Sequence, residues 1–182
     1  MRSGVVRTAA NIDESWIGTD ARSLFSEVLG VECHVLNDAD AAGVAEMRFG
    51  AGVGRRGVVM LVTLGTGIGS AVFTDGVLVP NTELGHLELD GGAAEKYAAS
   101  SVREDQDLSW RDWGHRVGRY LRMLDDLFSP ELFIIGGGVS KRFAKYEEHL
   151  REELGNNTEV VAAHTLNQAG IVGAALTAVQ AG

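Results

Sequence analysis

The sequence predicts an α/β fold with a mixed sheet, because strand-like apolar runs alternate with helical patterns along the chain. Residues 57–62 contain three valines and residues 132–135 are all apolar, a composition typical of buried strands. Residues 70–74 and 77–79 flank an Asp-Gly dipeptide, a turn signal that joins antiparallel strands in a hairpin. Strands connected through helices, together with one hairpin, give a mixed sheet.

Before the hairpin, the chain has two helical patterns. The elements expected there are, in order, a helix at residues 21–29, a short strand at residues 32–36 and a helix from Asp38 to about Arg48. The first helix lies between Asp20, a residue that favours helix starts, and Gly30, a residue that favours helix ends.

After the hairpin, helical patterns dominate. The expected elements are a loop at residues 80–92, two helices within residues 93–128 that break near residues 107–109, the strand at residues 132–135, a helix from its cap at Ser140 to about Leu154, a strand at Val160 and Val161, and a helix from Ala169 to Val179. Ser129 and Pro130 end the long helical region, since proline cannot continue a helix.

Composition excludes several classes of function. The chain has 182 residues and a formal net charge of −9, which argues against a general nucleic-acid binder. The single Cys33 allows neither an intrachain disulfide nor a cysteine-rich zinc site. No apolar run approaches the roughly 20 residues of a membrane helix, and the first residues do not resemble a signal peptide. We therefore expect a cytoplasmic protein that does not bind membranes.

Asn37 and Asp38 stand where an expected strand gives way to a helix, the position at which α/β folds place ligands. An aspartate at a helix N-terminus stays ionised and can accept a proton from a hydroxyl group. The alternative is that Asn37 or Asp38 only caps the helix. Asp40 is expected to be a solvated carboxylate of the first turn.

The loop after the hairpin carries Glu83, His86, Glu88 and Asp90. Carboxylates and an imidazole suit a polyol, because they can accept and donate hydrogen bonds to its hydroxyl groups. Glu95, at the start of the next helix, could reach the same pocket or serve only the helix dipole. The alternatives for the loop are a hard-metal site or an acidic surface.

Two glycine-rich turns are candidates for holding phosphate. Residues 63–69 lie between paired strands, where glycines let backbone N–H groups converge on an anion. Residues 136–138 follow a strand and open a helix, which is also a phosphate-binding layout, although a tight turn would need the same residues. Residues 52–57 match the spacing of a dinucleotide-binding motif but precede a strand, so we discount them.

Five segments, in this order, carry a resemblance to a known family: GVVRTAANIDESW, LNDADAAGVAEMRFG, TLGTGIGSAVF, DGVLVPNTELGHLE and IIGGGVSK. They resemble the ROK family of sugar kinases, on the actin and hexokinase (ribonuclease H-like) fold, and within it the polyphosphate glucokinases. The resemblance implies a glucokinase that transfers a phosphoryl group from polyphosphate, ATP or both to the 6-hydroxyl of glucose.

The resemblance also implies roles for particular residues. Asp38 would be the general base. The residues that would bind the sugar are Asn37, Glu83, His86, Glu95 and Asn11. The residues that would bind phosphate or nucleotide are Thr63, Gly65, Thr66, Gly67, Gly136, Gly137 and Gly138. A polyanionic donor needs a positive track, for which the candidates are Arg55, Arg56, Lys141, Arg142 and Lys145, each of which could equally be a solvated surface charge.

Domain organisation and cofactors follow from the same resemblance. Residues 1–36 would be a remnant of the small N-terminal lobe, residues 37–168 the large C-terminal lobe with both sites, and residues 169–182 a terminal helix returning to the small lobe. The family's opening phosphate hairpin is expected to be missing, so a non-catalytic sugar-binding remnant is the alternative function. A sugar-responsive regulator would need a DNA-binding segment upstream. We expect Mg²⁺ with the donor, no structural zinc, no metal-ligating site residue and a homodimer.

Overall fold

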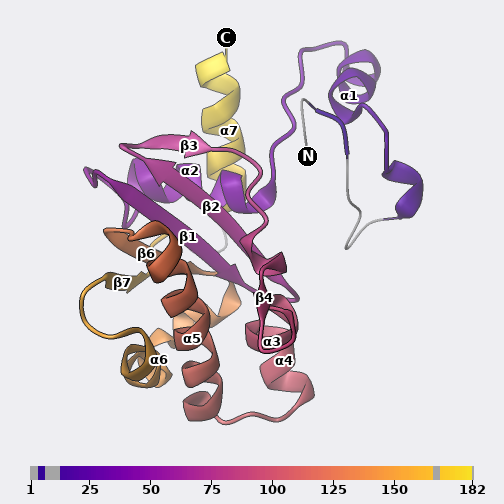
Figure 1. Ribbon diagram of the computed structural model, residues 1–182. Coiled ribbons are helices and arrows are strands. Elements are labelled where there is room, and N and C mark those ends of the chain that lie inside the picture. Colours follow the sequence, from indigo (N-terminus) through magenta and orange to yellow (C-terminus); the bar gives the residue numbers. More distant parts are fainter. Residues whose placement is uncertain (1–3, 7–12, 166–168, 182) are drawn as a thin grey trace.

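A five-stranded mixed sheet forms the centre of the computed structural model, which describes residues 4–6, 13–165 and 169–181 (Figure 1). The strands, in spatial order, are β3 (Val77–Val79), β2 (Ile68–Thr74), β1 (Val58–Leu64), β6 (Leu132–Gly136) and β7 (Glu159–Ala162). β2 is antiparallel to β1 and β3, whereas β6 is parallel to β1 and β7. The predicted α/β fold with a mixed sheet is confirmed.

Helices cover both faces of this sheet (Figure 1). One face carries α2 (Asp38–Phe49) and α7 (Ala169–Ala181), and the other carries α3 (Glu95–Ala98), α4 (Ser100–Asp105), α5 (Trp110–Phe128) and α6 (Glu147–Leu154). Successive side chains of the central strand β1 point to opposite faces of the sheet, so β1 contributes to the core on each face. Met60 and Val62 pack with the core under α5 and α6, and Val59 and Leu61 pack with the core under α2.

The N-terminal part stands beside the sheet (Figure 1). It contains the short 3₁₀ helix η1 (Glu14–Trp16) and α1 (Ala21–Leu29). The side chain of Asp20 accepts a hydrogen bond from Ser23 N at 3.0 Å, and Gly30 ends the helix at φ +67°. Both predicted boundaries of this helix are confirmed, because capping is decided by local sequence. The expected boundaries between the small and large lobes stay predictions. The C-terminal helix α7, which was expected to return to the small lobe, packs against α2.

Three local predictions differ from the structure. Residues 32–36 form no strand, since no described strand lies beside them to supply hydrogen bonds. Ser140 is not a helix cap, because its hydroxyl donates to Gly137 O at 2.8 Å within the 3₁₀ helix η3 (Gly138–Lys145). The region 80–92 is not all loop: it includes the 3₁₀ helix η2 (Leu84–His86) and the two-stranded pair β4 (Glu88–Leu89) and β5 (Gly92–Ala93).

The helical region at residues 93–128 has one more break than expected. Besides the predicted break before Ser109, the chain changes direction at Ala99, whose extended backbone separates α3 from α4. Ser109 caps α5 by accepting from Asp112 N at 3.0 Å, and Ser129 ends it in the left-handed conformation. Trp113 stabilises the turn at Ala99 by donating from its buried indole N–H to the carbonyls of Ala98 and Ala99.

Glu46 is a fully buried carboxylate near the end of α2. One oxygen accepts from Ala51 N at 2.8 Å, and the other accepts from the backbone N–H and the hydroxyl of Thr165 at 2.6 and 2.5 Å. Burial acts to raise the pKa of Glu46, but these hydrogen bonds outweigh it and hold the pKa below its ordinary value. Glu46 therefore ties α2 to the loop after it and to the segment after β7.

The Glu46→Gln variant is expected to lose about 2–3 kcal/mol of unfolding free energy, because the new amide group faces the Ala51 N–H and leaves it unpaired. Since the folded-state pKa of Glu46 is depressed, its contribution is present above pH 4.5 and is lost as the pH falls through the folded-state pKa. Urea unfolding at pH 7 and at pH 3 to 4 measures both effects. Glu148→Gln, at an exposed position of α6, is the control. Equal stability of the two variants at pH 7 would contradict this role.

Candidate functional site

A cavity of about 590 Å³ opens where β1 and β6 end and α2 begins. The carboxyl ends of parallel strands are the usual ligand position in α/β sheets. Its lining includes these predicted site residues: Asn37, Asp38, Thr63, Gly65, Thr66, Gly67, Glu83, His86, Glu95, Gly137 and Gly138. Gly136 is buried beneath them, and Asn11 lies outside the described residues. Folding thus brings five separate sequence segments to one cavity: residues 37–38, 63–67, 83–86, 95 and 137–138.

The N-terminus of α2 presents Asn37 and Asp38 to this cavity. Asn37 is the helix cap, since its Oδ1 accepts from Ala39 N at 2.8 Å and from Asp40 N at 3.3 Å. Capping fixes the side chain and points its amide nitrogen away from the helix, where it can donate to a ligand. Asp38 is exposed in the cavity, and its Oδ1 accepts from Ala39 N at 2.9 Å. Its second carboxylate oxygen has no partner among the described residues.

Ser70 and Thr82 fix the loop that carries Glu83 and His86. Ser70 is buried in β2, and its hydroxyl accepts from Leu84 N at 3.1 Å while donating to Thr82 O at 3.0 Å. The hydroxyl of Thr82 donates in return to Ser70 O at 3.0 Å. These bonds hold η2 against the sheet, so that Glu83 and His86 face the cavity from exposed positions.

Asp40 is fully buried, so its prediction as a solvated carboxylate was wrong. Its Oδ2 accepts from Asn81 N at 2.8 Å and thereby joins the first turn of α2 to the loop that carries Glu83 and His86. Burial raises the pKa of Asp40, and the hydrogen bond from Asn81 opposes that shift only in part. Its other oxygen, Oδ1, has no hydrogen-bond partner within the described part of the chain. Asp40 therefore helps to position the two walls of the cavity.

Glycines make the floor of the cavity. Gly69 and Gly136 flank Thr63 on the two neighbouring strands, in direct register with it. A Cβ on Gly69 would lie 2.6 Å from Thr63 Oγ1, and one on Gly136 would lie 3.2 Å from Thr63 Cγ2. A Cβ on Gly67 would lie 2.7 Å from Glu95 Oε2. The missing side chains leave room for the Thr63 hydroxyl and the Glu95 carboxylate to reach the cavity.

A second cavity of about 660 Å³ shares Gly65, Thr66 and Gly138 with the first. Its charged lining residues are Arg103, Arg142, Lys145 and Glu104. Three cations and one carboxylate make this wall positive on a chain of net charge −9. Such a local field favours a polyanionic ligand.

Of the five cations proposed for the donor track, two line this cavity: Arg142 and Lys145. Arg55 lies elsewhere and pairs with Glu159 at 2.8 Å, while Arg56 and Lys141 line neither cavity. Sequence reasoning missed Arg103, which lies over the ring of Trp110 at 4.2 Å. It also missed the positioning roles of Asp40 and Ser70. Their spacing in the sequence carries no signal of the contacts they make.

None of the helices in the described ranges is long and apolar enough to cross a membrane.

The chain matches a known protein family over most of its length. The model of the ROK family matches residues 2–102 and 95–181. The chain is 52% identical over 174 residues to a polyphosphate glucokinase of Mycobacterium leprae, covering 95% of this chain and 52% of that protein. It is 52% identical over 177 residues to a polyphosphate glucokinase of Mycobacterium tuberculosis, covering 97% of this chain and 65% of that protein. The chain therefore spans less than two thirds of the length of these relatives.

Solved structures show the same fold. The inorganic polyphosphate/ATP-glucomannokinase of Arthrobacter sp. strain KM superimposes with a TM-score of 0.91 at 51% identity, covering 99% of this chain and 70% of that one. A ROK family glucokinase from Streptomyces griseus, in complex with glucose and AMPPNP, superimposes with a TM-score of 0.81 at 26% identity, covering 98% and 80%. The actin and hexokinase-like fold implied by the sequence motifs is confirmed. On the family match and the fold together, this chain belongs to the ROK family.

Proposed function

We propose that this chain carries the sugar and donor sites of a glucokinase, which transfers a phosphoryl group from polyphosphate, ATP or both to the 6-hydroxyl of glucose. One observation carries the proposal: a carboxylate-lined cavity and a cation-lined cavity meet at Gly65, Thr66 and Gly138. Phosphoryl transfer requires a hydroxyl group and a polyanion to meet at one point, so a shared wall of glycine backbone suits that reaction.

In the sugar cavity, Asp38 accepts the proton of the 6-hydroxyl as that oxygen attacks the phosphorus atom. The bond between phosphorus and the leaving oxygen breaks, and the shortened donor departs with the negative charge. The remaining hydroxyl groups form hydrogen bonds with the side chains of Asn37, Glu83, His86 and Glu95, which together supply both donors and acceptors. Because the transition state is loose, positioning and charge neutralisation contribute more than proton removal.

In the donor cavity, Arg142, Lys145 and Arg103 attract the polyphosphate chain or the nucleotide phosphates. Backbone N–H groups of the glycine turns contact the phosphoryl group in transit. Mg²⁺ would enter with the donor and be held by the substrate phosphates and water. When bound, the ion neutralises charge on the phosphoryl group.

The proposal extends to assembly and location. A homodimer in the cytoplasm is what the family resemblance implies. Mannose is a second acceptor to test, since the Arthrobacter relative is a glucomannokinase.

The test is formation of glucose 6-phosphate by this 182-residue chain with Mg²⁺ and polyphosphate, ATP or no donor. Turnover that requires a donor supports the kinase. Calorimetry with glucose is run in parallel, because binding without turnover supports the alternative, a non-catalytic sugar-binding protein. Absence of both glucose binding and turnover contradicts the proposal.

The Arg142→Ala/Lys145→Ala double variant is expected to raise KM for polyphosphate by about tenfold or more, because each side chain contributes a charge-assisted contact to the donor. KM for glucose should change little, since neither residue lines the sugar cavity. Steady-state kinetics with each substrate varied in turn measures both. Lys141→Ala is the control, because Lys141 is an exposed cation of the same 3₁₀ helix that lines neither cavity. An equal effect of the double variant on both KM values would contradict the donor role.

A further inference from the structure

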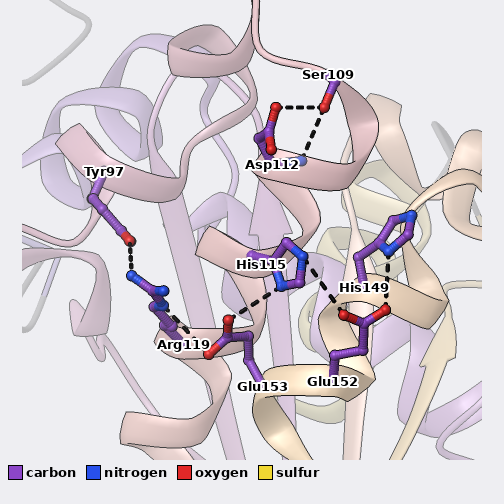
Figure 2. Close-up of polar contacts among 8 residues, drawn as sticks. All are labelled: Tyr97, Ser109, Asp112, His115, Arg119, His149, Glu152 and Glu153. Carbon is purple, nitrogen blue, oxygen red and sulfur yellow. Dashed lines mark hydrogen bonds and ion pairs between the residues drawn. The ribbon is translucent and has the colours of Figure 1, made fainter.

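Two histidines and a glutamate gather on one side of the α5–α6 pair, away from both cavities (Figure 2). His115 comes from α5, and His149 and Glu152 come from adjacent turns of α6. Glu152 Oε2 lies 3.7 Å from His115 Nε2, and Glu152 Oε1 lies 3.3 Å from His149 Nδ1. One ligand atom from each residue can be chosen so that all three lie within 4.8 Å of one another.

Close packing of α5 on α6 brings these residues together. A Cβ on Gly114 would lie 2.9 Å from His149 Cβ, and one on Gly118 would collide with the carbonyl oxygen of Leu150. The two glycines are one turn apart on the face of α5 that contacts α6, so the helices approach more closely than larger residues would allow. His115, next to Gly114, is thereby held 5.7 Å from His149, measured between ring centroids.

A second layer of polar groups supports His115. Its Nδ1 lies 3.1 Å from Glu153 Oε1, within ion-pair distance, although the alignment is too poor for a hydrogen bond. Nδ1 is buried and has no hydrogen-bond partner in the described part of the chain. Glu153 also pairs with Arg119 at 3.3 Å, and Arg119 donates to the hydroxyl of Tyr97 at 3.2 Å (Figure 2). This network anchors the Glu153 carboxylate beside the imidazole.

We propose that His115, His149 and Glu152 bind a divalent transition-metal ion of the Zn²⁺ class. Two imidazoles and one carboxylate are a known donor set for zinc, with the fourth position left to water. Ligand atoms of a tetrahedral zinc ion lie about 3.4 Å apart, given bond lengths of about 2.1 Å. The 3.3 and 3.7 Å separations go to the two different oxygens of Glu152, and one atom from each of the three residues lies within 4.8 Å of the others. Small side-chain rotations would bring these atoms to tetrahedral spacing.

The surroundings also favour the metal. The Glu153 carboxylate lies 3.1 Å from His115 Nδ1, so a small rotation would let it orient the imidazole as an outer carboxylate does for a metal-binding histidine. The three side chains are partly exposed, so an ion can enter from solvent. The site contains no cysteine, and its histidines are far apart in the sequence, so motif spacing does not reveal it. It differs from any cysteine-based zinc site, which the sequence excludes.

Calorimetric titration of the metal-free chain with Zn²⁺ tests the proposal, because it requires no catalytic activity. We expect one Zn²⁺ per chain at this site, and a rise in Tm of about 5 °C or more at a hundredfold excess over Kd. His115→Gln and His149→Gln should each weaken binding by about tenfold or more, and Glu153→Gln should weaken it through His115. Cys33→Ser/His34→Gln, which removes another pair of potential ligands, is the matched control and should leave this affinity unchanged.

A measurement on the unaltered chain guards against variants that fold poorly. As Zn²⁺ is added, the imidazole NMR signals of His115 and His149 should shift in parallel. They should do so at a lower Zn²⁺ concentration than the signals of His34, His86 and His164. Co²⁺ in place of Zn²⁺ should give the visible absorption of a tetrahedral site, lost in Glu152→Gln. Absence of stoichiometric Zn²⁺ binding by the unaltered chain, or binding unchanged in both histidine variants, would overturn the proposal and leave the cluster as a set of ion pairs.

Discussion

The Asp38→Asn variant is expected to lower kcat for phosphoryl transfer by about 10²–10⁴-fold while glucose affinity changes little. Asparagine has nearly the same size, and its carbonyl oxygen can still accept the 2.9 Å hydrogen bond from Ala39 N. It cannot take a proton from the 6-hydroxyl, and it removes a charge that orients that group. The interaction is therefore lost mainly in the transition state, so kcat and kcat/KM should fall together.

Glucose 6-phosphate formation and glucose calorimetry together measure the effect of this substitution. Glu88→Gln is the control, because Glu88 is an exposed carboxylate of the neighbouring segment that does not line the cavity. The control should retain its activity. If Asp38→Asn kept kcat within about threefold of the unaltered chain, a difference under 1 kcal/mol, Asp38 would not be the base.

The Gly137→Ala variant is expected to lose about 2–4 kcal/mol of unfolding free energy. Gly137 has φ +84°, a conformation that residues with a Cβ adopt at a cost. The added methyl group would also collide with the backbone carbonyl oxygen of Leu64, which cannot rotate away as a side chain can. Either β6 and β1 separate at their ends or the turn at residues 136–138 is distorted.

Urea unfolding of Gly137→Ala beside Gly138→Ala separates this clash from a general cost of losing glycine. A Cβ on Gly138 would meet no atom within 4 Å, and its φ is not in the left-handed region. Gly138→Ala should therefore lie within about 1 kcal/mol of the unaltered chain. If the two variants were equally stable, the close approach of Gly137 to Leu64 would have no energetic consequence.

Local patterns predicted most of the fold, because each element carries its own signals. The valine-rich run of β1, the Asp-Gly turn before β3 and the caps of α1 are decided by residues a few positions apart. The strand expected at residues 32–36 failed for the opposite reason: a strand exists only when another strand pairs with it, and the sequence does not show its neighbours. Ser140 failed because its hydroxyl bonds to Gly137, within a tighter 3₁₀ turn that competes with the α-helix.

The candidate site also has parts that the sequence predicts and parts that only the folded structure reveals. Glycine turns and carboxylate loops were recognisable as segments, and their convergence on one cavity followed from the sheet topology. The buried Asp40, the Ser70–Thr82 bonds and Arg103 act through contacts between segments, so their roles became visible only in the folded chain. The histidine pair across α5 and α6 is the extreme case, since it depends on how closely two helices pack.

The two cavities share the wall at Gly65, Thr66 and Gly138, so ligands bound in both would contact the same three residues. A ligand that orders this wall from one side removes part of the ordering cost for a ligand on the other side. Such coupling is reciprocal, so the factor by which a sugar tightens donor binding must equal the factor by which the donor tightens sugar binding. If acceptor and donor bind as proposed, these three small residues would place both ligands in a single free-energy cycle.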